Sequence, residues 1–160
     1  MSGMIQQLLP EILPVLPEII VVLFATILLV VMSFSQKLDV YSSAIFACMT
    51  LLIAISASMW CTTFTNPDNL WRGSLVFPKY IHLSRFVMLS ISFILMANIA
   101  LVSKIVHIRR EMPVLLLFMI FGLMLIILSN DLIMLYLCME LISMCVYICI
   151  THERTNIRAI

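Results

Sequence analysis

Charged residues are scarce in this sequence of 160 residues. Lysine, arginine, aspartate and glutamate together make up 11% of the chain, whereas 64% of the side chains are hydrophobic. The mean hydropathy is +1.20. A single soluble core cannot hide that much apolar surface. The composition therefore excludes a soluble domain and predicts a membrane protein.

The sequence also lacks the usual signatures of a self-contained enzyme. It has only three glycines, with no glycine-rich phosphate loop, no HExxH pair and no nucleophile triad. The net charge of +1 is spread over segment ends, so we expect no nucleic acid partner. The first residues show neither a basic region nor a small-residue cleavage site, and we expect no cleaved signal peptide.

Histidines and cysteines do not form a recognisable metal or haem pattern. The three histidines lie near the ends of apolar stretches, whereas a haem between membrane helices needs histidines inside the spans. Cys138, Cys145 and Cys149 share one stripe of a helix. Apolar packing explains such a stripe better than a metal site does. We therefore expect no cofactor and no metal in this chain.

Five apolar stretches have about the length, near 20 residues, that a helix needs to cross a hydrocarbon core of about 30 Å. They lie near 18–36, 41–60, 81–103, 113–129 and 131–150. Pro17 suits the first turn of the first helix, and Glu18 complements the positive end of its dipole. No internal repeat or soluble domain interrupts the pattern. The sequence predicts an all-α membrane protein in which residues 1–160 form a single membrane unit.

Five spans place the two ends of the chain on opposite sides of the membrane. The side that holds the carboxyl terminus receives most of the cations, namely Lys37, Lys104, Arg109, Arg110, Arg154 and Arg158. The other side receives Arg72, Lys79 and Arg85. The positive-inside rule therefore predicts that the amino terminus lies outside and the carboxyl terminus lies in the matrix or cytoplasm.

One carboxylate, Glu140, stands in the middle of the last span. Asp131 caps or opens this helix after a short SND turn, and Glu140 lies about 13.5 Å further along, near the midplane of the membrane. An ionised acid at that depth costs several kcal/mol. We therefore expect Glu140 to be protonated, paired with another group or next to a hydrated cavity.

Hydroxyl groups share the face of the helix that carries Glu140. At 100° per residue, an arc of roughly 60° contains Ser129, Tyr136, Glu140, Ser143 and Tyr147. Such a stripe indicates a proton pathway or a carboxyl group oriented toward another helix. The alternative is that Glu140 only hydrogen-bonds a neighbouring helix and fixes packing. The cysteine stripe lies about 180° away, so the acid and the thiols cannot form one site.

The segment MPVLLLFMIFGLMLIILSNDLIMLYLCMELISMCVYI, residues 112–148, resembles the fourth and fifth helices of the antiporter-like subunits of respiratory complex I. It is most similar to subunit 2 of NADH dehydrogenase, which is called subunit N in bacteria. The residues that match this pattern are Ser129, Asn130, Asp131, Leu132, Tyr136, Glu140, Leu141 and Ser143. The resemblance implies that Glu140 is the fifth-helix glutamate, which works with a lysine on a later, broken helix to move protons.

The helices that carry those lysines in the family are not in this sequence. Lys37, Lys79 and Lys104 lie near span ends and cannot replace them. We therefore expect either a truncated product or a split subunit, in which a second chain supplies the missing carboxyl-terminal helices and packs against the last span near Glu140.

These observations predict a membrane-arm subunit of NADH:ubiquinone oxidoreductase that helps to translocate protons and has no redox centre of its own. The expected partners are other complex I membrane subunits, the second chain and the lipid bilayer. Low glycine and alanine with abundant Ile, Leu, Phe and Met favour the mitochondrial inner membrane, with a bacterial plasma membrane as the alternative. Two other functions stay open: a subunit of a multisubunit sodium/proton antiporter, and a non-pumping structural subunit.

Overall fold

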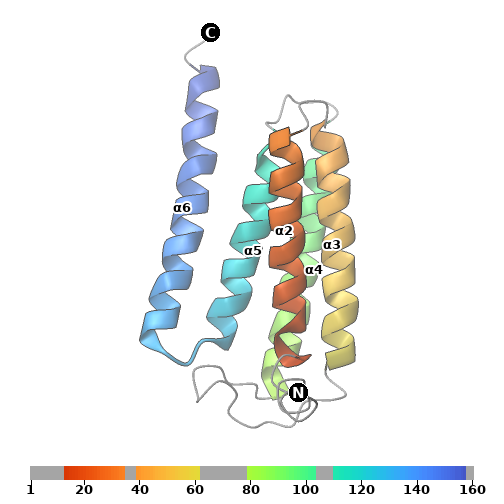
Figure 1. The fold of residues 1–160 in the computed structure, drawn as a ribbon, viewed down its shortest axis with the longest axis vertical. Helices are drawn as coiled ribbons and strands as arrows, with labels where there is room; N and C mark the ends of the chain where they lie inside the picture. Colours follow the sequence, from red (N-terminus) through yellow and green to blue (C-terminus); the bar gives the residue numbers. More distant parts are fainter. Residues whose placement is uncertain (1–12, 35–38, 62–78, 104–109, 158–160) are drawn as a thin grey trace.

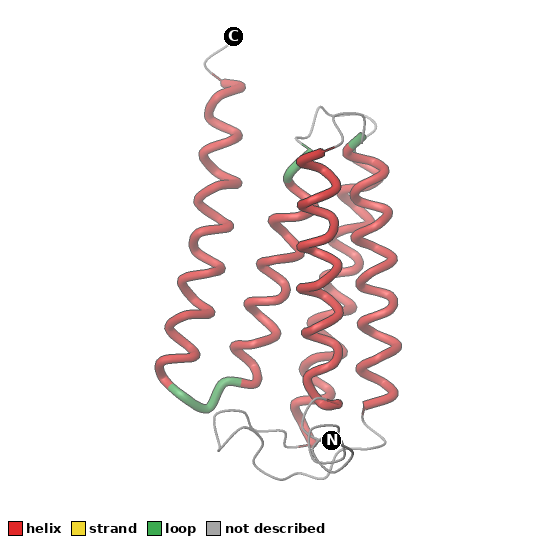
Figure 2. The backbone as a smooth tube through the Cα atoms, in the orientation of Figure 1, coloured by secondary structure: helices red, strands yellow, loops and turns green. Residues whose placement is uncertain are grey.

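The computed structural model describes residues 13–34, 39–61, 79–103 and 110–157, and these ranges contain helices and no strand (Figures 1 and 2). The elements are a short 3-10 turn η1 (Leu13–Val15) and the helices α2 (Leu16–Phe34), α3 (Val40–Cys61), α4 (Lys79–Val102), α5 (Met112–Leu128) and α6 (Leu132–Ile157). The all-helical fold with five long helices, predicted from hydropathy, is confirmed.

Four of the helices are long and apolar enough to cross a membrane: α2, α3, α4 and the Leu132–Thr151 part of α6. Helix α5 is apolar but has only 17 residues. At 1.5 Å per residue it is about 26 Å long, which is the lower limit for a spanning helix. The described chain is therefore a multi-pass membrane protein.

Helices α2 to α5 form a bundle, and α6 lies beside it (Figure 1). Within the bundle, α2 and α4 each pack against both α3 and α5, whereas α6 packs mainly against α5. Helices α2 and α4 are not among the pairs in extensive contact. The bundle therefore has α2 and α4 at opposite corners, and most of the surface of α6 is left outside it.

The core of the bundle is apolar and rich in small side chains. Ala25, Ala47 and Ala54 are completely buried, which lets neighbouring backbones approach closely. Larger side chains from all four helices fill the space between them, namely Val21, Leu28, Leu51, Leu89, Met96, Val114, Leu117, Ile120 and Met124. No described residue of α6 belongs to this cluster. The bundle thus has its own core, and α6 is added to its side.

The α5–α6 hairpin depends on one glycine. A Cβ atom at Gly122 would lie 2.8 Å from Cγ1 of Ile142, so only glycine permits this close approach. At the turn, Ser129 is the extended C-cap residue of α5, and its hydroxyl donates to the carbonyl of Ile126 at 2.9 Å. The prediction that Ser129 shares the stripe of Glu140 is therefore wrong, because α6 begins only at Leu132.

Candidate functional site

Glu140 lies on the outward face of α6, near the middle of its apolar part. It is the ninth residue of α6, about 12 Å along the axis from Leu132. Its side chain is exposed in this chain. Among the described residues, neither a hydrogen bond nor a salt bridge of its carboxylate is found. Any groups that cover this carboxylate must therefore lie outside the described helices.

The hydroxyl groups near Glu140 share its face but do not bind its carboxylate. Tyr136 and Tyr147 are 65% and 72% exposed. The hydroxyl of Ser143 is also exposed and donates to the backbone carbonyl of Glu140 at 2.8 Å. The structure thus brings these residues together on one face of α6. It does not connect them into a hydrogen-bonded chain.

The opposite face of α6 packs against α5. Cys138 and Cys145 are buried, with only 4% and 6% of their surface exposed. The acid and these thiols therefore lie on different sides of the helix, as the helical spacing predicts. Across the ranges that the structure describes, no three His, Cys, Asp or Glu side chains gather in a way that could hold a metal ion.

Asp131 lies just before the first residue of α6. Its carbonyl accepts the N–H of Leu135 at 3.0 Å, which is the first hydrogen bond of the helix. The side chain is exposed at the turn. Asp131 thus opens α6, and it lies about two and a half helical turns from Glu140.

A buried ion pair that the sequence did not predict joins opposite corners of the bundle. Nη2 of Arg85 in α4 lies 2.7 Å from Oε1 of Glu18 in α2, and the two residues are 0% and 1% exposed. Nη1 of Arg85 also donates to the carbonyl of Pro14 at 2.9 Å. Arg85 therefore ties α4 both to α2 and to the segment that leads into it.

The sequence did contain a signal for this pair. Arg85 lies more than one turn inside an apolar span, and a cation at that depth needs a counter-charge. Because α2 and α4 both begin at the same end of the bundle, Glu18 is the acid at the matching depth (Figure 1). The local pattern predicted only that Glu18 complements the helix dipole and that Arg85 contributes to the charge balance of the loops, and it did not predict their contact.

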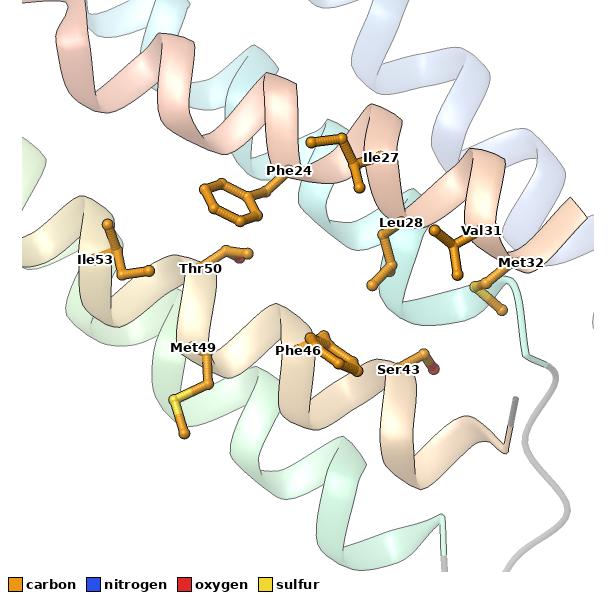
Figure 3. Close-up of a pocket in the computed structure, with 10 residues that line it drawn as sticks. All are labelled: Phe24, Ile27, Leu28, Val31, Met32, Ser43, Phe46, Met49, Thr50 and Ile53. Atoms are coloured by element: carbon orange, nitrogen blue, oxygen red, sulfur yellow. The ribbon is translucent and has the colours of Figure 1, made fainter. Parts of the chain in front are cut away.

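An apolar groove runs between α2 and α3 (Figure 3). Its volume is about 200 Å³, and Phe24 and Leu28 of α2 reach toward α3 along its length. The only hydroxyls that line it, on Ser43 and Thr50, donate to carbonyls of their own helix at 2.9 and 2.8 Å. The groove offers hydrocarbon alone and cannot orient a polar substrate.

Together, these features define a multi-pass helical membrane protein with an exposed acid in the middle of the apolar part of α6 and a buried ion pair between α2 and α4. The chain is 30% identical over 161 residues to NADH-quinone oxidoreductase subunit N of Parvibaculum lavamentivorans, and this alignment covers 94% of the chain. It is 29% identical over 152 residues to the same subunit of Paramagnetospirillum magneticum and 27% identical over 152 residues to that of Rhodospirillum rubrum.

These alignments cover 93% and 91% of this chain for the Paramagnetospirillum and Rhodospirillum proteins. The chain spans only about 30% of the length of the curated relatives that it matches. The resemblance drawn from residues 112–148 is thereby confirmed, and it extends over nearly the whole chain. No family model matches the sequence. No solved structure matches it either.

Proposed function

We propose that this chain is the amino-terminal part of an antiporter-like, proton-translocating subunit in the membrane arm of an NADH:quinone oxidoreductase. The observation that carries this proposal is the similarity to subunit N along nine-tenths of the chain, combined with an acid in the middle of α6. The proposed location is the mitochondrial inner membrane. The chain itself supplies helices and the carboxyl group of Glu140, and electron transfer takes place elsewhere in the complex.

Glu140 is the proposed proton carrier. In the low dielectric of a membrane its neutral form is favoured, whereas a nearby cation favours the carboxylate. Movement of such a cation, or hydration of the site, would therefore switch Glu140 between holding and releasing a proton. Tyr136, Ser143 and Tyr147 lie on the same face and could hold the water molecules that such a transfer needs.

The cation is proposed to come from a second polypeptide that covers the outward face of α6. The described residues supply no positive partner for Glu140, and the part matched here is only 30–31% of the length of the curated relatives. An exposed acid in the middle of a span is costly in lipid, so a protein surface or a hydrated cavity must cover it.

Two substitutions at Glu140 separate the proton-carrier role from a packing role. Glu140→Gln keeps the shape and much of the hydrogen bonding but removes the ionisation. The complex that contains this variant should assemble normally and lose proton translocation and coupled quinone reduction. If Glu140 only fixes packing, Gln should serve almost as well, whereas Glu140→Ala should impair assembly because partner groups lose their hydrogen bonds.

The matched control is Asp39→Asn, the same change from carboxylate to amide at an exposed position just before α3. It should leave both assembly and proton pumping unchanged. A Glu140→Gln complex that pumps protons at the normal rate would refute the proton-carrier role.

The second chain can be tested separately, with a photo-crosslinking amino acid in place of Tyr136 in the assembled complex. Tyr136 is exposed on the same face as Glu140 and one turn away from it. Mass spectrometry should identify the captured peptide as part of a spanning helix of a multi-pass chain that carries a lysine within a span. Adducts with lipid alone would show that no protein covers this face.

A further inference from the structure

A second cleft opens between α2, α5 and α6, and Met32 of α2 lines both this cleft and the α2–α3 groove. Its volume is about 440 Å³. The residues that matter for its chemistry are Leu29, Ser33, Arg110, Glu111, Leu115 and Ile148. The cleft exists because α6 packs mainly against α5 and not against α2 (Figure 1).

The cleft is polar at one end and apolar along its walls. Ser33 is the last residue but one of α2, and Arg110 and Glu111 directly precede α5, so the polar groups lie at helix ends. Leu29 and Leu115 lie one helical turn, about 6 Å, further into the membrane. A ligand that fits this arrangement has a polar head at the membrane surface and a hydrocarbon chain beneath it.

The charges at the polar end indicate which head group fits. The guanidinium of Arg110 has the planar geometry that binds a phosphate with two hydrogen bonds. The carboxylate of Glu111 next to it attracts an ammonium group and repels a second anion. A head group with one phosphate and one primary amine complements both side chains. A purely anionic head group complements only one of them.

We propose that this cleft binds one aminophospholipid of the phosphatidylethanolamine type. Its phosphate contacts Arg110, its ammonium group contacts Glu111, and one acyl chain lies along Leu29, Leu115 and Ile148. The hydroxyl of Ser33 lies at the same end of the cleft, beside the head group. Positively charged pockets between membrane helices bind lipid phosphates by the same electrostatic attraction.

The size of the cleft suits one hydrocarbon chain. The cleft holds about 440 Å³, which lies within the range of about 300–1,000 Å³ for small-molecule sites. One hydrocarbon chain can therefore enter it.

The lipid site and the proposed partner surface do not compete for space. Ile148 lies eight residues after Glu140, which is about 80° around α6 from it. A protein can therefore cover the face with Glu140 while a lipid occupies the cleft. The lipid proposal requires only that the chain spans the membrane, and it stands or falls independently of proton translocation.

Native mass spectrometry of the full chain in detergent tests the proposal. Phosphatidylethanolamine, phosphatidylcholine and phosphatidylglycerol with identical acyl chains are added one at a time. Phosphatidylethanolamine should bind most tightly, because the quaternary amine of phosphatidylcholine cannot donate a hydrogen bond and phosphatidylglycerol has no amine. Equal retention of all three lipids would overturn the proposal.

Variants then assign the two ends of the lipid. Arg110→Gln should weaken binding of all three lipids by about tenfold, which corresponds to about 1.4 kcal/mol. Glu111→Gln should remove the preference for phosphatidylethanolamine over phosphatidylcholine. Leu29→Trp should fill the apolar part of the cleft and reduce binding of every lipid.

The matched control is Lys79→Gln, which removes a positive charge at the first residue of α4, at the end of the bundle opposite Arg110 (Figure 1). It should leave lipid retention unchanged. Unaltered lipid binding by both Arg110→Gln and Leu29→Trp would show that the lipids bind elsewhere. A cross-link from position 29 to another polypeptide in the complex would show that protein fills the cleft instead.

Discussion

The buried ion pair between Glu18 and Arg85 makes a quantitative prediction about the stability of the bundle. The two charges are 2.7 Å apart and almost completely buried, and Arg85 also donates to the carbonyl of Pro14. Removal of one partner of such a pair leaves the other charge buried and alone, which costs about 3–5 kcal/mol. Arg85→Met should therefore lower the free energy of unfolding by that amount.

The size of this loss in stability distinguishes an unpaired buried charge from the loss of an ordinary hydrogen bond between helices. Hydrogen bonds between membrane helices contribute on average only about 0.6 kcal/mol. The double variant Glu18→Leu with Arg85→Met buries no charge, and apolar replacements of whole ion pairs are often neutral or stabilising. Its stability should therefore return to within about 1 kcal/mol of the wild type, or exceed it.

Reversible unfolding in mixed micelles of mild detergent and dodecyl sulfate measures these differences. The control is Asp39→Asn, at an exposed position just before α3, where the change should alter stability by no more than about 0.5 kcal/mol. Hydrogen exchange should also increase around Pro14 in the Arg85→Met variant, because the bond that holds this segment is lost. If Arg85→Met unfolds like the wild type, or the double variant is as unstable as the single one, the ion pair does not hold the bundle together.

Two further predictions concern the hairpin and the topology. Gly122→Ala should destabilise the α5–α6 contact, because an overpacking cost of about 1–3 kcal/mol outweighs a gain in helix propensity of about 1 kcal/mol. A second substitution, Ile142→Ala, should relieve the clash. A Gly122→Ala variant that is more stable than the wild type in the same micelle assay would contradict the close approach. In a variant whose only cysteine is Cys61, a membrane-impermeant maleimide should react from the outer side, since the positive-inside rule places the 61–80 segment there; labelling from the matrix side alone would overturn the orientation.

Helix content and helix order could be predicted because they follow from local properties of the chain. Unbroken apolar stretches of nearly 20 residues can satisfy their backbone groups in lipid only as helices. The observed helices α2 to α6 therefore lie close to the stretches read from hydropathy. The predicted extension of the acid stripe to Ser129 failed, because the chain leaves the helix at that residue and donates from Ser129 to α5.

The position of Glu140 was also readable from the sequence alone. Its distance from Asp131 fixes its depth, and the helical repeat fixes which residues share its face. The structure places Tyr136, Ser143 and Tyr147 on that exposed face and Cys138 and Cys145 on the buried one. The chemistry of this face depends on groups outside the described helices, which the sequence pattern of one helix does not contain.

Only the tertiary structure decided which charges inside the membrane meet. Glu18 and Arg85 lie on α2 and α4, and the whole of α3 lies between them in the sequence. Their contact depends on how α2 and α4 face each other across the bundle. The same holds for the cleft beside Arg110, which is lined by residues of α2, α5 and α6 together. Hydropathy and helical period act along one helix and determine its length and its faces. Pairing between helices depends on the shape of side chains from distant segments, and no local pattern contains that information.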